Sequence, residues 1–130
     1  MKLLDITYYA VKRAHAGLGI FAQKDISKGE RIIEYIGPML TAAQADEKGG
    51  QYLFEISSRR TIDGATRKNV ARYINHSCAP NADAFIEGSR VFIYAKRLIK
   101  SGEEISYNYG KAFFNEYIKP KGCRCVKCKA

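Results

Sequence analysis

The hydrophobic residues of this chain occur in short runs that alternate with polar positions, and glycines separate the runs at intervals typical of strands. The β-branched and aromatic residues that strands favour are concentrated in four of these runs. The four predicted strands cover residues 31–36, 51–56, 90–94 and 104–109. The pattern therefore predicts a mainly β fold with short strands and frequent turns.

One helix is predicted over residues 41–48. Thr41 can cap this helix, because its hydroxyl can accept a hydrogen bond from a free backbone N–H of the first turn. The segment TAAQADEK has good helix propensity, and Gly49-Gly50 ends it. Shorter helical turns are expected over residues 69–74 and 111–117, and a tight turn is expected at Asp63-Gly64.

Two segments of the chain resemble each other at an offset of 73 residues. They are AQKDISKGERIIEYIG, which begins at Ala22, and AKRLIKSGEEISYNYG, which begins at Ala95. Turn-then-strand units can look alike for purely local reasons. The alternative, which we favour, is that the two copies are structurally equivalent and face each other. The identical pairs are Ala22/Ala95, Ile26/Ile99, Gly29/Gly102, Glu30/Glu103, Ile32/Ile105 and Gly37/Gly110.

The composition fits a single globular domain. The chain has 130 residues, of which 46% are hydrophobic and 27% are charged. No apolar run is long enough to cross a membrane, and the N-terminal segment MKLLDITYYAVKR is too polar for a signal peptide. We therefore expect an intracellular protein without a membrane partner, in a compartment where cysteines stay reduced.

The net charge of +9 is high for a chain of this length. Such a charge favours acidic partners such as nucleic acid or the nucleosome. Scattered surface lysines that only keep the protein soluble are an equally good explanation, because the charge is spread along the chain. The densest cluster is at the C-terminus and consists of Lys119, Lys121, Arg124, Lys127 and Lys129.

The cysteines form a cluster of three, Cys123, Cys125 and Cys128, with Cys78 standing apart. Four reduced thiolates can hold one zinc ion tetrahedrally, and such a site has no open position, so its role is structural. Disulfide bonds and free thiols are the alternatives, although bridges between such close neighbours are strained. We expect the zinc site, which would fasten the C-terminal tail to the loop that carries Cys78.

Four blocks of the sequence, in this order, resemble the SET-domain family of protein-lysine methyltransferases. They are AGLGIFA with Gly17 and Gly19, EYIG with Tyr35 and Gly37, RYINHSCAPN at residues 72–81 and EEISYNYG at residues 103–110. The C-terminal CRCVKC resembles the post-SET zinc motif, which Cys78 would complete. The resemblance covers about residues 13–128, and the block NHSC followed by PN is its most specific part.

The resemblance implies a mainly β SET domain (β-clip) of several small curved sheets with short helices and a C-terminal pseudoknot. The SET domain would cover residues 1–110, and residues 111–130 would form a post-SET zinc-binding tail of the same globular unit. The chain departs from the family pattern in three ways. Two residues instead of the usual four separate Cys125 from Cys128, Asn108 replaces the frequent aspartate, and no cysteine-rich pre-SET region is present.

The activity that the resemblance implies is N-methylation of lysine side chains by S-adenosylmethionine, in a histone or another basic protein. A lysine amine has a pKa of about 10.4, so its neutral form costs roughly 4–5 kcal/mol at pH 7, and an apolar channel lowers that pKa. The resemblance places Tyr35, Tyr107 and the catalytic Tyr109 around the amine. A tyrosine at position 107 narrows the channel and predicts mono- or dimethylation.

The resemblance also implies the residues that bind the cofactor and the substrate. The backbone of the glycine-rich turn can approach the cofactor closely because side chains are missing there. The implied cofactor-binding residues are Gly17, Leu18, Gly19, Arg72, Asn75, His76 and Tyr109, and Tyr117 would cover the adenine. The substrate peptide would add a strand to the edge at residues 51–56, where it would contact Tyr52, Phe54 and Glu55.

Two other classes of function stay open from the sequence. The first is a non-catalytic SET-like module that binds a peptide or nucleic acid, and the second is a small zinc-dependent nucleic-acid-binding protein. The second leaves the blocks NHSC and YNYG without a role. The expected location is the nucleus or chromatin in a eukaryote and the cytoplasm in a bacterium, and the sequence does not indicate an oligomeric state.

Overall fold

The computed structural model describes residues 9–14, 17–50 and 52–109. The described strands are β1 (Tyr9–Ala14), β2 (Gly17–Ala22), β3 (Arg31–Tyr35), β4 (Met39–Thr41), β5 (Leu53–Ser57), β6 (Arg60–Asp63), β7 (Asn75–His76), β8 (Ala82–Glu87), β9 (Arg90–Ala95) and β10 (Glu104–Tyr107). The described helices are α2 (Ala42–Lys48) and the 3-10 turn η1 (Val70–Tyr73). The predicted mainly β fold is confirmed.

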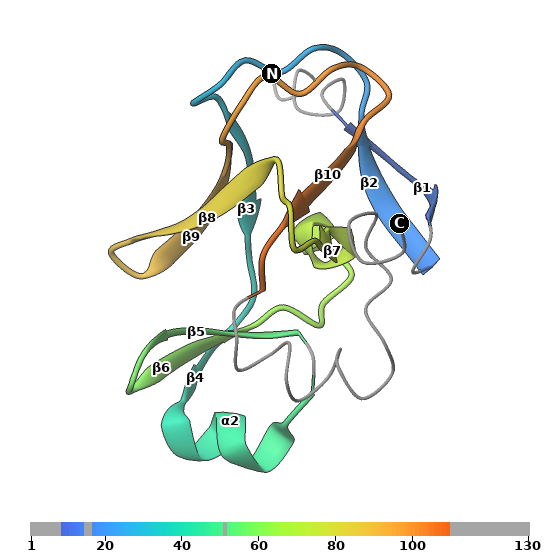
Figure 1. Ribbon diagram of the computed structural model, residues 1–130. Coiled ribbons are helices and arrows are strands. Elements are labelled where there is room, and N and C mark those ends of the chain that lie inside the picture. The colour runs from blue at the N-terminus through green and yellow to red at the C-terminus, as the bar shows by residue number, and fades with distance from the viewer. Residues whose placement is uncertain (1–8, 15–16, 51, 110–130) are drawn as a thin grey trace.

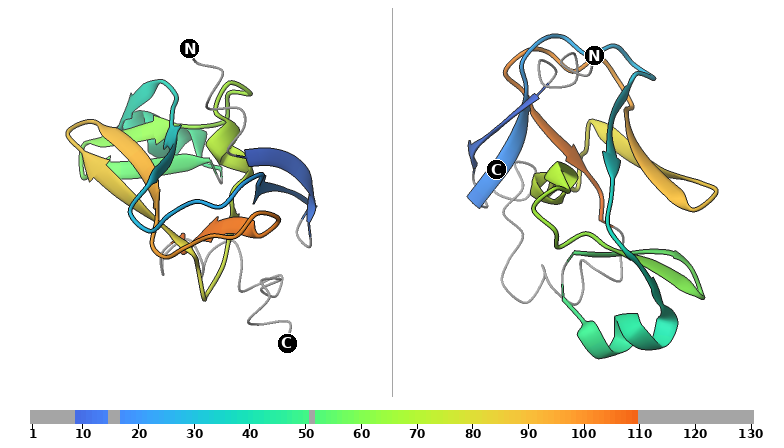
Figure 2. Two further views of the ribbon diagram at one scale, coloured as in Figure 1. Left: turned by 90° about the horizontal axis from the view of Figure 1, so that it is seen from above. Right: turned by 180° about the vertical axis from the view of Figure 1, so that it is seen from behind.

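The described strands form three small sheets, with the strand orders β1-β2-β10-β7, β3-β9-β8 and β4-β6-β5 (Figure 1). The β4-β6-β5 sheet and α2 lie at one end of the molecule, and the loops that join β2 to β3 and β9 to β10 lie at the other (Figure 2). This arrangement of small sheets agrees with the architecture that the SET resemblance implies.

The unit β1-β2-β3 is repeated as β8-β9-β10. The two hairpins have the same register, because Tyr9 pairs with Ala22 in the first and Ala82 pairs with Ala95 in the second. The third strand of each unit leaves its own hairpin and pairs with the other one. Thus β3 pairs with β9, and β10 pairs with β2, both antiparallel.

The loops between the second and third strands meet at the centre of this repeat. The backbone N–H of Ile26 donates to the carbonyl of Ile99, and that of Ile99 donates to Ile26, both at 2.8 Å. Gly29 and Gly102 occupy equivalent turns with φ of +86° and +95°, which L side chains rarely adopt. The interpretation that the two sequence copies are equivalent and face each other is therefore confirmed.

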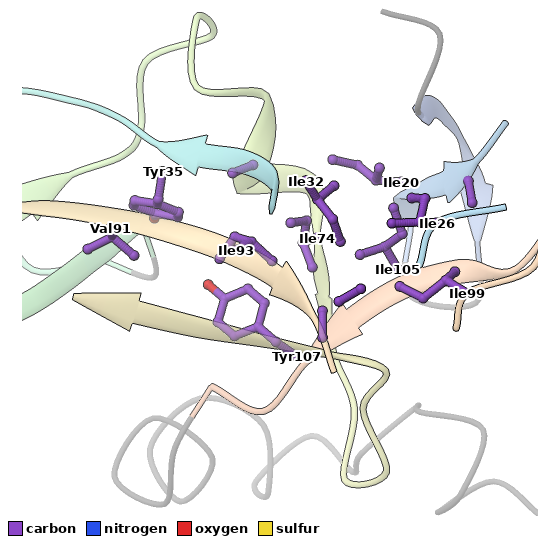
Figure 3. Close-up of a cluster of buried hydrophobic side chains, with 14 of the residues drawn as sticks. Ile20, Ile26, Ile32, Tyr35, Ile74, Val91, Ile93, Ile99, Ile105 and Tyr107 are labelled. Carbon is purple, nitrogen blue, oxygen red and sulfur yellow. The ribbon is translucent and has the colours of Figure 1, made fainter. Parts of the chain in front are cut away.

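The hydrophobic core consists largely of equivalent side chains from the two units (Figure 3). Ile20 and Ile93 are both fully buried, as are Ile26 and Ile99. Full burial of an isoleucine side chain contributes roughly 1.5–3 kcal/mol. Isoleucines at the same two positions of each unit therefore stabilise both units and hold them against each other.

A β-bulge in β3 changes the correspondence beyond the loops. Glu104 pairs with Phe21 as Arg31 pairs with Tyr94, which preserves the offset of the repeat. The register of β3 shifts between Arg31 and Ile33, so Ile33, not Ile32, is the residue that pairs with Ile93. The sequence match of Ile32 with Ile105 is therefore displaced by one position in the strand pairing.

The segment between the two units carries the predicted helix. Thr41 Oγ1 accepts the Gln44 N–H at 3.2 Å, and Gln44 Oε1 accepts the Thr41 N–H at 2.8 Å, which is a capping box. Gly49 ends α2 with φ of +60°. Both boundaries of the predicted helix are confirmed, as is the helical turn over residues 69–74, which contains η1.

The strands predicted over residues 31–36 and 90–94 are confirmed as β3 and β9 to within one residue. The strand predicted over residues 51–56 is found as β5. The strand predicted over residues 104–109 is too long, because β10 ends at Tyr107, where its short parallel pairing with β7 also ends. The chain turns at Gly64 as predicted, and the side chain of Asp63 accepts the Ala65 N–H at 3.1 Å.

Several predictions fall on residues that the structure does not describe. The helical turn over residues 111–117, Tyr117 and the whole tail over residues 111–130 lie outside the described residues. The C-terminal pseudoknot stays a prediction, because strand pairing alone does not define how the chain is threaded.

Candidate functional site

A cleft of about 730 Å³ lies between α2, β5, η1 and the end of β10. The predicted catalytic tyrosines and the predicted substrate-binding residues line the same cleft. The predicted site residues in its wall are Tyr35, Tyr52, Phe54, Glu55, Arg72, Tyr107 and Tyr109. Residues that are distant in the sequence are therefore brought together at one place.

Tyr35 is held in the cleft wall by two close backbone approaches. Its hydroxyl donates to the carbonyl of Tyr52 at 2.7 Å. A Cβ on Gly64 would lie 2.4 Å from the Tyr35 ring, and a Cβ on Gly37 would lie 1.9 Å from the carbonyl oxygen of Asp63. Gly64 therefore leaves room for the Tyr35 ring. Gly37, the glycine of the block EYIG, leaves room for the backbone of the Asp63-Gly64 turn.

Tyr107 and Tyr109 form an aromatic wall beside Tyr35. Their ring centroids are 5.1 Å apart, and the Tyr35 and Phe54 centroids are 5.3 Å apart. Tyr107 is the last residue of β10 and is buried, whereas Tyr109 lies just past the strand. The Tyr109 hydroxyl donates to the carbonyl of Ile74, which fixes the direction of its O–H bond.

Burial changes the acid–base properties of these three tyrosines. It raises the pKa of Tyr35, Tyr107 and Tyr109 well above the ordinary value, and the neighbouring tyrosine hydroxyls raise it further. The phenols therefore stay protonated at neutral pH and act through hydrogen bonds. The same desolvation would disfavour a charged ammonium group beside them.

Asn69 is a supporting residue that the sequence did not single out. It is fully buried, its Nδ2 donates to the carbonyl of Gly64 at 3.0 Å, and its Oδ1 accepts the Ile36 N–H at 3.0 Å. These two bonds join the Gly64 turn to the end of β3 and so hold Tyr35 in place. Only its position before a helical turn marked it, and that signal is not specific.

The predicted cofactor-binding residues of β2 and β7 meet across β10. Asn75 Nδ2 donates to the carbonyl of Leu18 at 2.9 Å, which links β7 to the glycine-rich segment Gly17–Gly19 of β2. A Cβ on Gly19 would lie 3.0 Å from Asn75 Nδ2 and 2.5 Å from Glu104 Oε2. The absence of a side chain at Gly19 therefore lets polar groups approach the β2 backbone, as a polar ligand would require.

His76 is a neutral ring in this neighbourhood. Its Nδ1 accepts the backbone N–H of Tyr109 at 3.1 Å, so the proton of the neutral ring is on Nε2. Burial lowers the pKa of His76, which keeps the ring uncharged at pH 7. The ring packs edge-on against Tyr109, with centroids 5.4 Å apart. His76 thereby connects the candidate cofactor residues to the tyrosine wall.

Arg72 lies on the cleft side of the molecule. Its guanidinium carbon is 4.7 Å from the centroid of the Tyr52 ring, and its Nη1 donates to the carbonyl of Ala65. Its Nε is buried without a hydrogen-bond partner among the described residues. A cofactor role for Arg72 stays a prediction, whereas its place in the wall of the cleft is observed.

Asn81, the last residue of the block RYINHSCAPN, fixes β10. Its Nδ2 donates to the carbonyl of Glu104 at 2.9 Å, and its Oδ1 accepts the Ser106 N–H at 3.0 Å. The buried amide thus replaces a neighbouring strand at this point of β10. These two bonds give Asn81 a structural role that the sequence analysis did not predict.

Cys78 is half-buried, and its Sγ lies 3.4 Å from His76 Nε2. The other three predicted zinc ligands, Cys123, Cys125 and Cys128, lie outside the described residues. Among residues 9–14, 17–50 and 52–109, no group of three histidine, cysteine or acidic side chains could hold a metal ion. The zinc site stays a prediction.

Residues 17–110 match the SET domain. The histone-lysine N-methyltransferase set-2 of Caenorhabditis elegans is 42% identical over 114 residues, which cover 78% of this chain and 8% of the relative. The H3 lysine-4 specific histone-lysine N-methyltransferase of Schizosaccharomyces pombe is 41% identical over 115 residues, or 78% of this chain and 12% of the relative. The trithorax histone-lysine N-methyltransferase of Drosophila virilis is 35% identical over 135 residues, which cover 94% of this chain and 4% of the relative.

The chain thus spans a small fraction of the length of these relatives. In the part of the chain that the structure describes, no helix is long and apolar enough to cross a membrane. The SET-domain match covers more than half of the chain and includes the glycine-rich segment, the NHSC block and Tyr109. The chain belongs to the SET-domain family.

Proposed function

We propose that this domain transfers a methyl group from S-adenosylmethionine to a lysine side chain of a histone. The observation that carries the proposal is the cleft in which Tyr35, Tyr107 and Tyr109 meet, at the end of the strand β10 that pairs with the glycine-rich strand β2. The SET-domain match and the relatives named histone-lysine N-methyltransferases support it.

The cleft supplies the conditions that lysine methylation needs. The attacking amine must be neutral, which costs roughly 4–5 kcal/mol for a lysine in water at pH 7. Aromatic rings and buried backbone around the tyrosine wall disfavour the ammonium form and lower that cost. The cofactor supplies the activated methyl group, and the protein holds the amine in line with it.

Tyr109 is the residue proposed to orient the amine. Its O–H bond donates to the carbonyl of Ile74, and a phenol oxygen that donates in this way can also accept a hydrogen bond from an amine. Its raised pKa keeps it a neutral phenol, so it positions the amine and does not take its proton. Tyr35 lines the opposite wall of the channel.

Tyr107 is proposed to limit the number of methyl groups that are added. Its buried hydroxyl narrows the channel end beside Tyr109. We expect mono- and dimethyl-lysine as products, and Tyr107→Phe, which removes the hydroxyl, should shift the products toward higher methylation. Trimethyl-lysine as the main product of the wild-type protein would contradict this assignment.

The substrate peptide is proposed to pair with β5, which is an edge strand of the β4-β6-β5 sheet. Peptides often bind by adding a strand to such an edge. Asp46 and Glu55 line the cleft beside it. This local acidity suits a lysine-rich peptide, although the whole chain carries a charge of +9.

The cofactor is proposed to bind along Gly17–Gly19, with Asn75, His76 and Arg72 around it. A polar cofactor with an aromatic base fits this set of groups. They are Gly19, which has no side chain, the carbonyl of Leu18, and the rings of His76 and Tyr109. The tail over residues 111–130 is proposed to bind one structural zinc ion together with Cys78. The chain carries a net charge of +9, and its basic side chains are proposed to contact nucleosomal DNA. The expected location is chromatin.

Calorimetry with S-adenosylmethionine, followed by mass spectrometry of histones incubated with the cofactor and the full chain, tests the proposed function. We expect saturable binding and methylated lysine. If the cofactor does not bind, the enzyme assignment is wrong. If it binds but no lysine of any histone is modified, the domain is a binding module without catalysis or acts on another protein, and the histone assignment is wrong.

A further inference from the structure

Glu104, on β10, has a carboxylate that lies directly against the β2 backbone. A Cβ on Gly19 would be 2.5 Å from Glu104 Oε2, so a side chain at this position would displace the carboxylate from its place. Asn75 Nδ2 donates to the same oxygen at 2.8 Å. The side chain is therefore held at the centre of the residues proposed to bind the cofactor.

The repeated unit shows what these positions look like when they serve only the fold. The equivalents of Gly19 and Glu104 are Phe92 and Arg31, and the Arg31 guanidinium carbon lies 3.8 Å from the centroid of the Phe92 ring. Two large side chains fill the space where β3 meets β9. Where β10 meets β2, one side chain is absent and the other carries the opposite charge.

Glu104 differs in its partners from three other glutamates of the described residues. Glu34, Glu87 and Glu103 each form an ion pair with an arginine. Glu104 forms no ion pair with any described residue, although the chain carries a net charge of +9. Its half-buried carboxylate is bonded to a neutral amide and acts electrostatically on Tyr109.

Two acceptors converge at this place. Asn75 Nδ2 donates both to Glu104 Oε2 and to the carbonyl of Leu18, at 2.8 and 2.9 Å, so both oxygens surround one nitrogen. A carboxylate and a carbonyl arranged in this way suit a ligand group that is positively charged and has several N–H donors. An ammonium group has both properties, whereas a sulfonium group has no N–H.

We propose that Glu104 binds the ammonium group of the methionyl part of the cofactor. The inference rests on the proposed function, because it needs S-adenosylmethionine as the ligand. Glu104 acts here as a cofactor-binding residue that positions the methionyl chain between β2 and β7. The bond that it forms is charge-assisted, and the loss of such a bond weakens binding by about tenfold.

The test is calorimetry with three probes on the full chain and on Glu104→Gln. Glutamine keeps an oxygen that can accept from Asn75, and it loses only the charge. The probes are S-adenosylmethionine, S-adenosylhomocysteine, which lacks the sulfonium, and 5′-methylthioadenosine, which lacks the sulfonium and the ammonium. We expect the Kd of the first two to rise about tenfold and the Kd of the third to stay within about twofold.

The control is Glu103→Gln, which removes the adjacent carboxylate. Glu103 pairs with Arg97 at 2.9 Å and is not among the groups nearest to Gly19, so its loss should leave all three Kd values unchanged. Equal binding of S-adenosylmethionine by the wild type and Glu104→Gln would overturn the inference alone. The same would follow if all three probes weakened equally, which indicates a structural role, or if only S-adenosylmethionine weakened, which indicates contact with the sulfonium.

A measurement on the wild-type protein covers the case in which Glu104→Gln does not fold. The probe is an analogue of S-adenosylhomocysteine in which hydrogen replaces the amino group. We expect it to bind at least about tenfold more weakly than S-adenosylhomocysteine, and equal affinity would overturn the inference. If the wild type binds neither S-adenosylmethionine nor S-adenosylhomocysteine, the proposed function fails and the inference fails with it.

Discussion

The two repeated units of this domain have the same backbone plan but different side chains where they face the candidate cofactor site. In the hairpin β8-β9, Arg90 pairs with Glu34 of β3, and Phe92 lies against the guanidinium of Arg31, which is also on β3. In the unit β1-β2-β3, the positions equivalent to Arg90 and Phe92 are Gly17 and Gly19. One hairpin thus carries large side chains at these two positions, and the other carries none.

The comparison separates the residues that maintain the fold from those that serve the site. The buried isoleucines at the centre of the repeat are the same in both units, because either hairpin needs the same packing against the other. The positions of Gly19 and Phe92 are buried in both hairpins but hold side chains of very different size. A single repeated backbone therefore carries a half closed by large side chains and a half with the candidate cofactor residues.

The largest effect is expected at the shared core. Ile26→Ala and Ile99→Ala should each lower the free energy of unfolding by about 2–5 kcal/mol, because each removes a fully buried side chain and leaves a cavity. The equivalence of the two units predicts that the two losses are similar. Urea unfolding of both variants measures them, and losses that differ by more than about twofold would show that the two loops do not contribute equally.

Removal of a hydroxyl should have different effects in the cleft and on the outer face of β9. Tyr109→Phe should lower the rate of methyl transfer by about 10²-fold, because the amine loses the group that orients it. Tyr94→Phe makes the same change on β9, where the hydroxyl contacts Arg31 and Glu87, and should leave the rate unchanged. Mass spectrometry of a histone substrate compares them, and equal labelling by wild type and Tyr109→Phe would remove Tyr109 from the mechanism.

A smaller loss of stability is expected at the two equivalent turns, which contain Gly29 and Gly102. Gly29→Ala and Gly102→Ala should each cost about 1–2 kcal/mol, because both residues have positive φ and neither would place a Cβ within 4 Å of another group. Strain alone then determines the loss. Thermal unfolding of the two variants should give matching decreases, and a neutral substitution at either turn would contradict the repeat as described.

The smallest effect is expected on the pH dependence of stability, through His76 of the candidate cofactor site. Because burial lowers the pKa of His76, the unfolded chain binds more protons than the folded one as the pH falls below about 6.5, and stability decreases with acid there. Urea midpoints at pH 7.5 and 5.5 should differ less for His76→Gln than for the wild type. His15→Gln, a change at the other histidine, is the control. If the difference between the two urea midpoints is the same in His76→Gln as in the wild type, His76 is not the group responsible for the loss of stability in acid.

The sequence by itself determined the mainly β class, the helix over residues 41–48 and the repeated segments. These features depend on local chemistry: a capping threonine, two glycines after the helix, and a glycine with positive φ in each turn. It also identified the tyrosines and the block NHSC through the family resemblance. The cleft gathers these tyrosines as expected, although β10 ends before Tyr109.

Only the tertiary structure decided how the two halves exchange their third strands and which residues support the site. The pairing of β3 with β9, the bulge after Arg31 and the bonds of Asn69 join positions that are distant in the sequence. Local propensity carries no information about such register and packing. Gly19 and Glu104 illustrate the point, because neither residue predicts the other until β2 and β10 lie side by side.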